Sequence, residues 1–112
     1  MNKIIDTGIT KEILNRENHP QLKIADKLYT VDNRQSTWNK IQEITNSQEL
    51  DNNEKNDKIF ELALGVEEAK EIKDMDLPVE NYTYLTFCVM GAISGEDPKE
   101  LQKMAKENAR KN

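Results

Sequence analysis

The stretch TYLTFCVMGAISG, residues 83–95, is the one long apolar segment in a chain otherwise dense with Glu, Lys, Asn and Asp. Crossing a bilayer takes about 20 predominantly apolar residues, and extending this segment that far upstream takes in Pro78, Glu80 and Asn81. The segment therefore predicts a helix of a non-membrane protein. Because apolar side chains occur on nearly all sides of it, this helix must be central to the core or shared with a partner.

The composition of the chain limits both the size of its hydrophobic core and the ligands that it can bind. With 112 residues, of which 36% are hydrophobic and 33% charged, it is expected to form one domain with a small core. The formal net charge of −5 argues against binding to a phosphate backbone, which depends on clustered Lys and Arg. No nucleic-acid partner is expected.

The sequence holds few groups that carry out chemistry. Cys88 and His19 are its only cysteine and histidine, whereas structural zinc needs four N or S ligands and a catalytic zinc site about three. Neither a Gly-rich phosphate loop nor a GxSxG or HExxH motif occurs. We expect a protein that is not an enzyme and binds no cofactor or metal. The lone cysteine and the absence of a secretory h-region favour the cytoplasm.

The segment 51–62 is a candidate calcium loop, because Asp51, Asn53 and Asp57 fall at ligand positions one, three and seven. An EF-hand also needs Gly at position six and Glu at position twelve, and here these are Asn56 and Leu62. The pattern favours a solvated loop followed by the start of a helix.

Residues 1–20 are expected to form a loosely attached N-terminal arm, with a short helix capped by Thr10, and residues 21–112 a single α-rich domain. Within that domain, apolar and polar residues alternate over residues 21–32, as in a β-hairpin. Placing the turn at Asp26-Lys27 puts four apolar side chains on one face in two facing pairs, Ile24 with Tyr29 and Leu22 with Val31.

Helical periodicity begins after residue 33. Trp38, Ile41 and Ile44 recur every three residues, in a helix that Ser36 or Asn33 can cap. The segment 46–57 reads as a polar, flexible loop. A second helix is predicted over 58–64.

Glycine and proline mark the remaining helix boundaries. Gly65 ends the second helix and precedes a short third one, over 66–75. Pro78 begins the apolar helix 78–94, and Gly95 ends it. Asp97 followed by Pro98 starts the last helix, with Glu100 completing a capping box. The prediction is a mainly α fold of four to five short helices with an N-terminal β-hairpin packed on them.

The apolar helix and the last helix are expected to supply a partner-binding surface. A domain this small has few elements with which to surround an apolar helix, and exposed apolar patches usually mark association. Gly91 within GAISG indicates close approach of another helix or of the hairpin, with a dimer seam as the alternative. We expect a homo-oligomer through this surface. The candidate partner-binding residues are Tyr82, Leu85, Phe87, Val89, Met90, Ile93, Leu101 and Met104, with Ala105 beside them in the self-association surface.

The order of elements resembles small tail assembly chaperone-like proteins of long-tailed bacteriophages and prophages of Gram-positive bacteria. The resemblance covers roughly residues 21–105 and rests on layout and a few positions. Ala25-Asp26 stands where the family often has Asn-Gly. The matching features are an I-x-x-K-x-Y-x-V hairpin (Ile24, Lys27, Tyr29, Val31), a helix ending in LALG at Gly65, and an apolar penultimate helix after a D-x-P pair (Asp76, Pro78).

The resemblance implies a non-enzymatic role. Such proteins bind the long, apolar tape-measure protein and keep it soluble while tail-tube subunits assemble around it, and they often self-associate. The implied partner is the tape-measure protein, with the tail-tube protein as a second candidate. The alternative is a small regulatory module of a mobile element, transcriptional or antitoxin-like, in which helices over 59–73 read DNA. The outward Glu and Asp residues of that segment argue against it.

Overall fold

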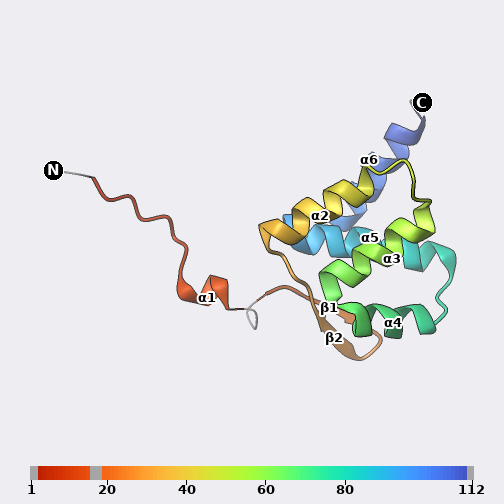
Figure 1. The fold of residues 1–112 in the computed structure, drawn as a ribbon, viewed down its shortest axis with the longest axis horizontal. Helices are drawn as coiled ribbons and strands as arrows, with labels where there is room; N and C mark the ends of the chain where they lie inside the picture. The colour runs from red at the N-terminus through yellow and green to blue at the C-terminus, as the bar shows by residue number, and fades with distance from the viewer. Residues whose placement is uncertain (1–2, 16–18, 111–112) are drawn as a thin grey trace.

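A computed structural model describes residues 3–15 and 19–110 and shows a mainly helical fold with an antiparallel two-stranded hairpin near its N-terminus (Figure 1). The predicted fold class is confirmed. Five helices follow the hairpin, and a one-turn helix precedes it. The elements are α1 (Lys11–Leu14), β1 (Gln21–Ile24), β2 (Lys27–Thr30), α2 (Gln35–Thr45), α3 (Asn52–Leu64), α4 (Val66–Asp74), α5 (Val79–Ser94) and α6 (Pro98–Arg110).

The hairpin forms where the alternation predicts it, but its register is two residues away from the predicted one. The strands pair Leu22 with Tyr29 and Ile24 with Lys27, so the turn is Ala25-Asp26 and not Asp26-Lys27. Ala25 takes a φ of 55°, a conformation that non-glycine residues adopt uncommonly. Because side chains alternate with period two, an even shift leaves the predicted residues on the same face.

That face of the hairpin closes the hydrophobic core. The core lies between the hairpin and helices α2 to α5, and its central side chains have lost almost all contact with solvent. Each of these elements contributes at least one of them. The largest fully buried side chains are Tyr29, Val31, Ile41, Phe60, Ile72 and Val89.

Helix α3 begins at Asn52, six residues before the predicted start at residue 58, so half of the predicted polar loop is helical. The carboxylate of Asp51 accepts a 2.8 Å hydrogen bond from the main-chain N–H of Glu54, which is how an N-cap satisfies the first turn. The N-cap of α2 also differs from the prediction. It is Arg34, rather than Ser36 or Asn33, and its side chain makes no capping bond.

The predicted helix ends at glycine are confirmed. Gly65 separates α3 from α4 with a φ of 98°, and Gly95 ends α5 in the left-handed conformation with a φ of 82°. Pro98 is the first residue of α6, and the Asp97 carboxylate accepts a 2.8 Å hydrogen bond from the N–H of Lys99. This sharp reversal lays α6 back along α5.

Gly91 lies where that reversal closes on α5. A Cβ at this position would come within 2.6 Å of the carbonyl oxygen of Glu96 and 3.1 Å of the ring of Pro98. The close approach predicted at Gly91 is therefore present, and the segment that approaches it is the turn between α5 and α6. Any side chain larger than hydrogen would push the two helices apart.

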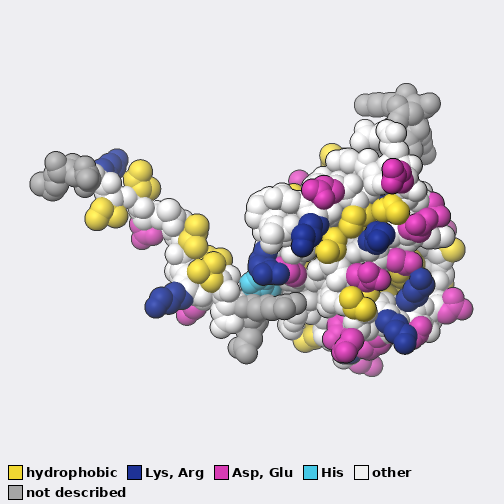
Figure 2. Space-filling view, in the orientation of Figure 1, with side chains coloured by type: hydrophobic (Ala, Val, Ile, Leu, Met, Phe, Trp, Pro, Cys, Tyr) yellow, Lys and Arg dark blue, Asp and Glu magenta, His cyan; other side chains and the backbone are white. Residues whose placement is uncertain are grey.

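The arm, defined here as residues 3–15, extends away from the helical body (Figure 1). The Cα radius of gyration is 16.1 Å, whereas a compact domain of this length has about 13 Å. Within the arm, Thr10 caps α1 as predicted by accepting a hydrogen bond from the N–H of Ile13. Hydrophobic side chains follow one another along the arm (Figure 2).

Candidate functional site

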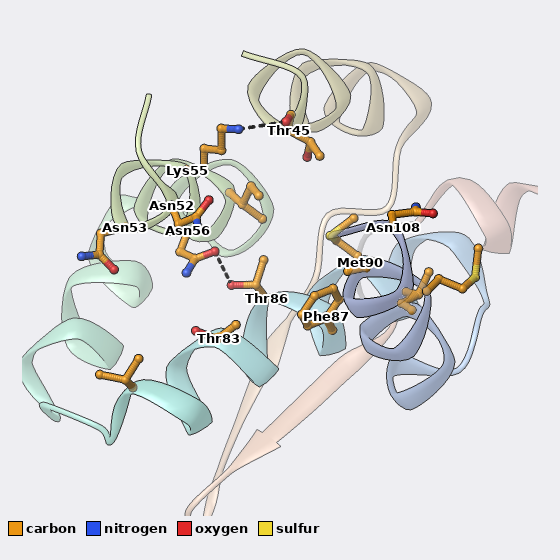
Figure 3. Close-up of a pocket in the computed structure, with 15 residues that line it drawn as sticks. Thr45, Asn52, Asn53, Lys55, Asn56, Thr83, Thr86, Phe87, Met90 and Asn108 are labelled. Carbon is orange, nitrogen blue, oxygen red and sulfur yellow. Dashed lines mark hydrogen bonds between the residues drawn. The ribbon is translucent and has the colours of Figure 1, made fainter. Parts of the chain in front are cut away.

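A groove of about 730 Å³ runs between α3 and α6, with α5 as its floor (Figure 3). Helix α5 reaches it with residues spaced three or four apart, so one face of α5 lines the groove while the opposite face enters the core. The lining residues come from α2, α3, α5 and α6. They are Thr45, Asn52, Asn53, Lys55, Asn56, Ile59, Val79, Thr83, Thr86, Phe87, Met90, Leu101, Met104, Ala105 and Asn108.

The floor and the α6 wall of the groove are mostly apolar. Phe87 and Met90 lie on α5, and Leu101 and Met104 face them from α6. Met104 is 54% exposed, and Val79, at the start of α5, is 81% exposed. Flexible methionine side chains can repack against different apolar surfaces. This part of the groove is suited to hold the apolar face of a helix or an extended apolar segment.

The opposite wall, formed by α3, is polar but uncharged at most positions. Asn56 Oδ1 accepts a 2.9 Å hydrogen bond from the hydroxyl of Thr86, which ties α3 to the floor (Figure 3). The ammonium of Lys55 donates to the carbonyl oxygen of Thr45 at 3.1 Å, which ties α3 to the end of α2. Among the described residues that line the groove, none is Asp or Glu, although the chain has 21 of them.

The structure brings half of the candidate partner-binding residues together in this groove, namely Phe87, Met90, Leu101 and Met104. The others face elsewhere. Val89 is completely buried, so it belongs to the core part of the helix. Leu85 and Ile93 are partly buried and pack against the core cluster, as does Tyr82.

Tyr82 joins three helices through a carboxylate. Its hydroxyl donates a 2.6 Å hydrogen bond to Oδ1 of Asp57 on α3, and Lys73 on α4 donates to Oδ2 at 2.8 Å. Burial raises the pKa of Tyr82 well above its usual range, and the hydrogen bond to Asp57 raises it further. Burial also acts to raise the pKa of Asp57, but the hydrogen bonds from Lys73 and Tyr82 outweigh it, and the pKa is lowered.

A second carboxylate, Asp32, connects the hairpin to α2. Its oxygens accept hydrogen bonds from the Arg34 guanidinium at 2.9 and 2.8 Å and from the Thr37 hydroxyl at 2.8 Å. The hydrogen bond from the Arg34 side chain is the main cause of a strongly lowered pKa for Asp32. Asp32 is therefore a buried, charged and fully engaged group with a structural role.

Glu71 makes a third connection of this kind, between α4 and the hairpin. It accepts hydrogen bonds from the Lys27 ammonium at 2.7 Å and the Tyr29 hydroxyl at 2.8 Å. The hydrogen bond from Lys27, followed by that from Tyr29, lowers the pKa of Glu71. None of these three carboxylates lines the groove.

Within the described ranges, no group of three or more His, Cys, Asp and Glu side chains is arranged to hold a metal ion. The segment tested as a calcium loop is instead the first turns of α3, with Asp51 as its N-cap and Asp57 bound to Lys73. Residues 3–15 and 19–110 contain no helix whose length and apolar character would allow it to cross a lipid bilayer.

Comparison of the chain with protein-family models, curated proteins and solved structures found no match. The groove is therefore interpreted from its own residues. Sequence reasoning identified its apolar side chains from the helical pattern of residues 78–105. It does not identify the asparagines of α3, because the polar composition before residue 58 predicts a loop. The pairing of Asp51 with Glu54 three residues later was the signal that could have extended that helix.

Proposed function

We propose that this protein is a non-enzymatic phage tail assembly chaperone that holds an apolar segment of the tape-measure protein in the groove and keeps it soluble. The single observation that carries this proposal is the contrast between the groove and the rest of the surface. The groove presents apolar side chains, amides, threonines and one lysine, Lys55, and no carboxylate among the described lining residues, whereas the exposed helix faces carry the charge of an acidic protein.

That contrast suits a soluble carrier of an apolar helix. An amphipathic or apolar helix binds in a hydrophobic groove through residues spaced three or four apart. A groove without carboxylates avoids burying an unpaired negative charge against such a helix, which would be costly. The acidic exterior keeps the complex dispersed in water, because net charge opposes aggregation. The resemblance of the sequence layout to tail assembly chaperone-like proteins supports the same role.

Co-expression with the tape-measure protein of the same phage tests the proposal. We expect the two to co-purify, with more of the tape-measure protein in the soluble fraction than when it is expressed alone. Met104→Glu, which puts a charge on the α6 wall, should abolish most of the co-purification. Leu28→Glu is the matched control, because Leu28 is also an exposed apolar residue but lies outside the groove.

The proposal fails if the tape-measure protein neither co-purifies nor becomes more soluble, or if Leu28→Glu and Met104→Glu have the same effect. The alternative of a DNA-reading regulator makes a different prediction, which is salt-sensitive binding to duplex DNA. Its candidate helix α4 exposes Glu67 and Glu71, and two of the lysines near them are engaged in ion pairs, Lys73 with Asp57 and Lys27 with Glu71. Glu and Asp also outnumber Lys on α4, which does not favour contact with a phosphate backbone.

A further inference from the structure

The arm and the groove hold most of the large apolar side chains that the fold leaves uncovered. Among the described residues, ten large hydrophobic side chains are exposed. Five of them lie on the arm, and two, Val79 and Met104, line the groove. The five on the arm are Ile4, Ile5, Ile9, Ile13 and Leu14, with exposed fractions from 56% to 92%.

We propose that the arm of one copy binds in the groove of a second copy, so that the chain forms a reciprocal dimer. Each copy then contributes one arm and one groove, and a two-fold arrangement satisfies both at once. The exposed isoleucines of the arm cover the apolar floor and α6 wall, and the apolar surface of the arm is removed from water in the same step.

Charge supports this pairing. The arm contains Lys3 and Lys11 against Asp6 and Glu12, so it carries no net charge, and the net charge of −5 belongs to the rest of the chain. Two acidic bodies repel each other, but an arm without net charge entering a groove without carboxylates brings no acidic groups together across the groove lining. The contact therefore joins an arm without net charge to a groove whose one charged residue among the described lining is Lys55.

Geometry favours a second copy over the groove of the same chain. The arm leaves the body on the side away from the C-terminal end of α6 (Figure 1). The chain is fixed at the base of the arm, because the carbonyl oxygen of Pro20 accepts a 2.8 Å hydrogen bond from the N–H of Val31.

The first test measures molecular mass by light scattering over a range of concentrations, with the full chain and no partner protein. We expect the measured mass of the wild type to rise with concentration to twice that of the 13.0 kDa chain. An arm variant, Ile5→Glu with Ile9→Glu, and a groove variant, Met104→Glu, should both remain at the mass of a single chain. Leu28→Glu should behave as the wild type, and circular dichroism should show unchanged helix content in all four proteins.

The second test mixes the arm variant with the groove variant. The arm variant keeps an intact groove and the groove variant keeps an intact arm, so together they should form a 1:1 complex that neither forms alone. A symmetric contact between two α5 helices would not be restored in this way. The complex should be lost when the arm variant also carries Met104→Glu and is then mixed with the groove variant.

Three results would overturn the proposal: a wild type that stays a monomer at high concentration, an arm variant that still associates, or a mixture that stays monomeric. A monomeric wild type would mean that the arm binds its own groove or none. The arm and a tape-measure segment would occupy the same groove and exclude each other there, but these tests contain only this chain. A failed co-expression test with the tape-measure protein therefore does not contradict the dimer proposal. A monomeric wild type, in turn, does not contradict the proposed binding of the tape-measure protein.

Discussion

The hydroxyl of Tyr82 on α5 donates a 2.6 Å hydrogen bond to Asp57 on α3, while the ring of Tyr82 meets Phe60 edge-on at 5.0 Å between ring centroids. One side chain therefore makes both a polar and an aromatic contact to α3. Helix α5 is the floor of the groove and α3 one of its walls, so this pair holds the floor against that wall near the start of α5.

Replacing Tyr82 by Phe should keep the aromatic contact and remove the hydrogen bond. We expect the free energy of unfolding to fall by about 1 kcal/mol, because Asp57 retains Lys73 as a partner. Urea denaturation measures this change. Tyr84→Phe is the control on the same helix, where the hydroxyl has no carboxylate partner on α3 and the expected loss is smaller. Equal losses in the two variants would contradict the assigned role of Tyr82.

Asp32→Asn should change how stability depends on pH. Because the pKa of Asp32 is lowered in the folded state, its charge stabilises the fold above the unfolded-state pKa of about 3.9, and this contribution is lost as the pH falls further. The variant should lose about 1.5–3 kcal/mol at pH 7, the range for hydrogen bonds to charged groups. The gap from the wild type should narrow below about pH 4.

Denaturation curves from pH 7 down to the acid range measure this gap. Glu43→Gln, on the exposed side of the same helix α2, is the control and should leave stability near the wild-type value. A gap that is constant with pH would show that Asp32 acts through packing and not through its charge.

Gly91→Ala should destabilise the junction of α5 and α6. The added methyl group meets the Glu96 carbonyl oxygen, and such overpacking costs about 1–3 kcal/mol. The gain in helix propensity, up to about 1 kcal/mol, offsets only part of it. Thermal unfolding should show this loss of stability. Asn81→Ala, on the exposed surface of α5, is the control and should show no such loss. A Gly91→Ala protein as stable as the wild type would mean that the turn is free to move.

Val89 and Met90 are adjacent in sequence but should respond differently to a charge. Val89 is fully buried, so Val89→Glu should unfold the domain, whereas Met90→Glu should retain helix content and lose binding in the groove. Circular dichroism together with co-purification separates the two outcomes. A folded Val89→Glu protein would place that residue at a contact surface instead of in the core.

The sequence predicted the fold well where a boundary depends on one local rule. Gly65, Gly95 and the Asp97-Pro98 pair each limit the backbone conformation directly, and the helices end or start there. The hairpin turn has no such residue. Ala25 reaches a positive φ only because the paired strands hold it there, so the sequence predicted the right face but not the right register.

The candidate site was predictable in its apolar half only. Phe87, Met90, Leu101 and Met104 belong to helical patterns that mark an apolar face without saying which neighbour covers it. Asn52 and Asn56 have no such pattern, and their place opposite α6 follows from tertiary packing of α3 on α5. The division of α5 between Val89 in the core and Met90 in the groove likewise depends on where the neighbouring helices lie.

The position of Asp32 has a consequence for how the domain opens. Its main-chain N–H donates a 2.8 Å hydrogen bond to the carbonyl oxygen of Ala63 in the last turn of α3, while its carboxylate holds the first turn of α2. The hairpin cannot lift from α3 without releasing α2, so these three elements form one cooperative unit. Deuterium exchange at the Asp32 amide should therefore report the opening of this three-element unit, whereas amides of the arm exchange independently of it.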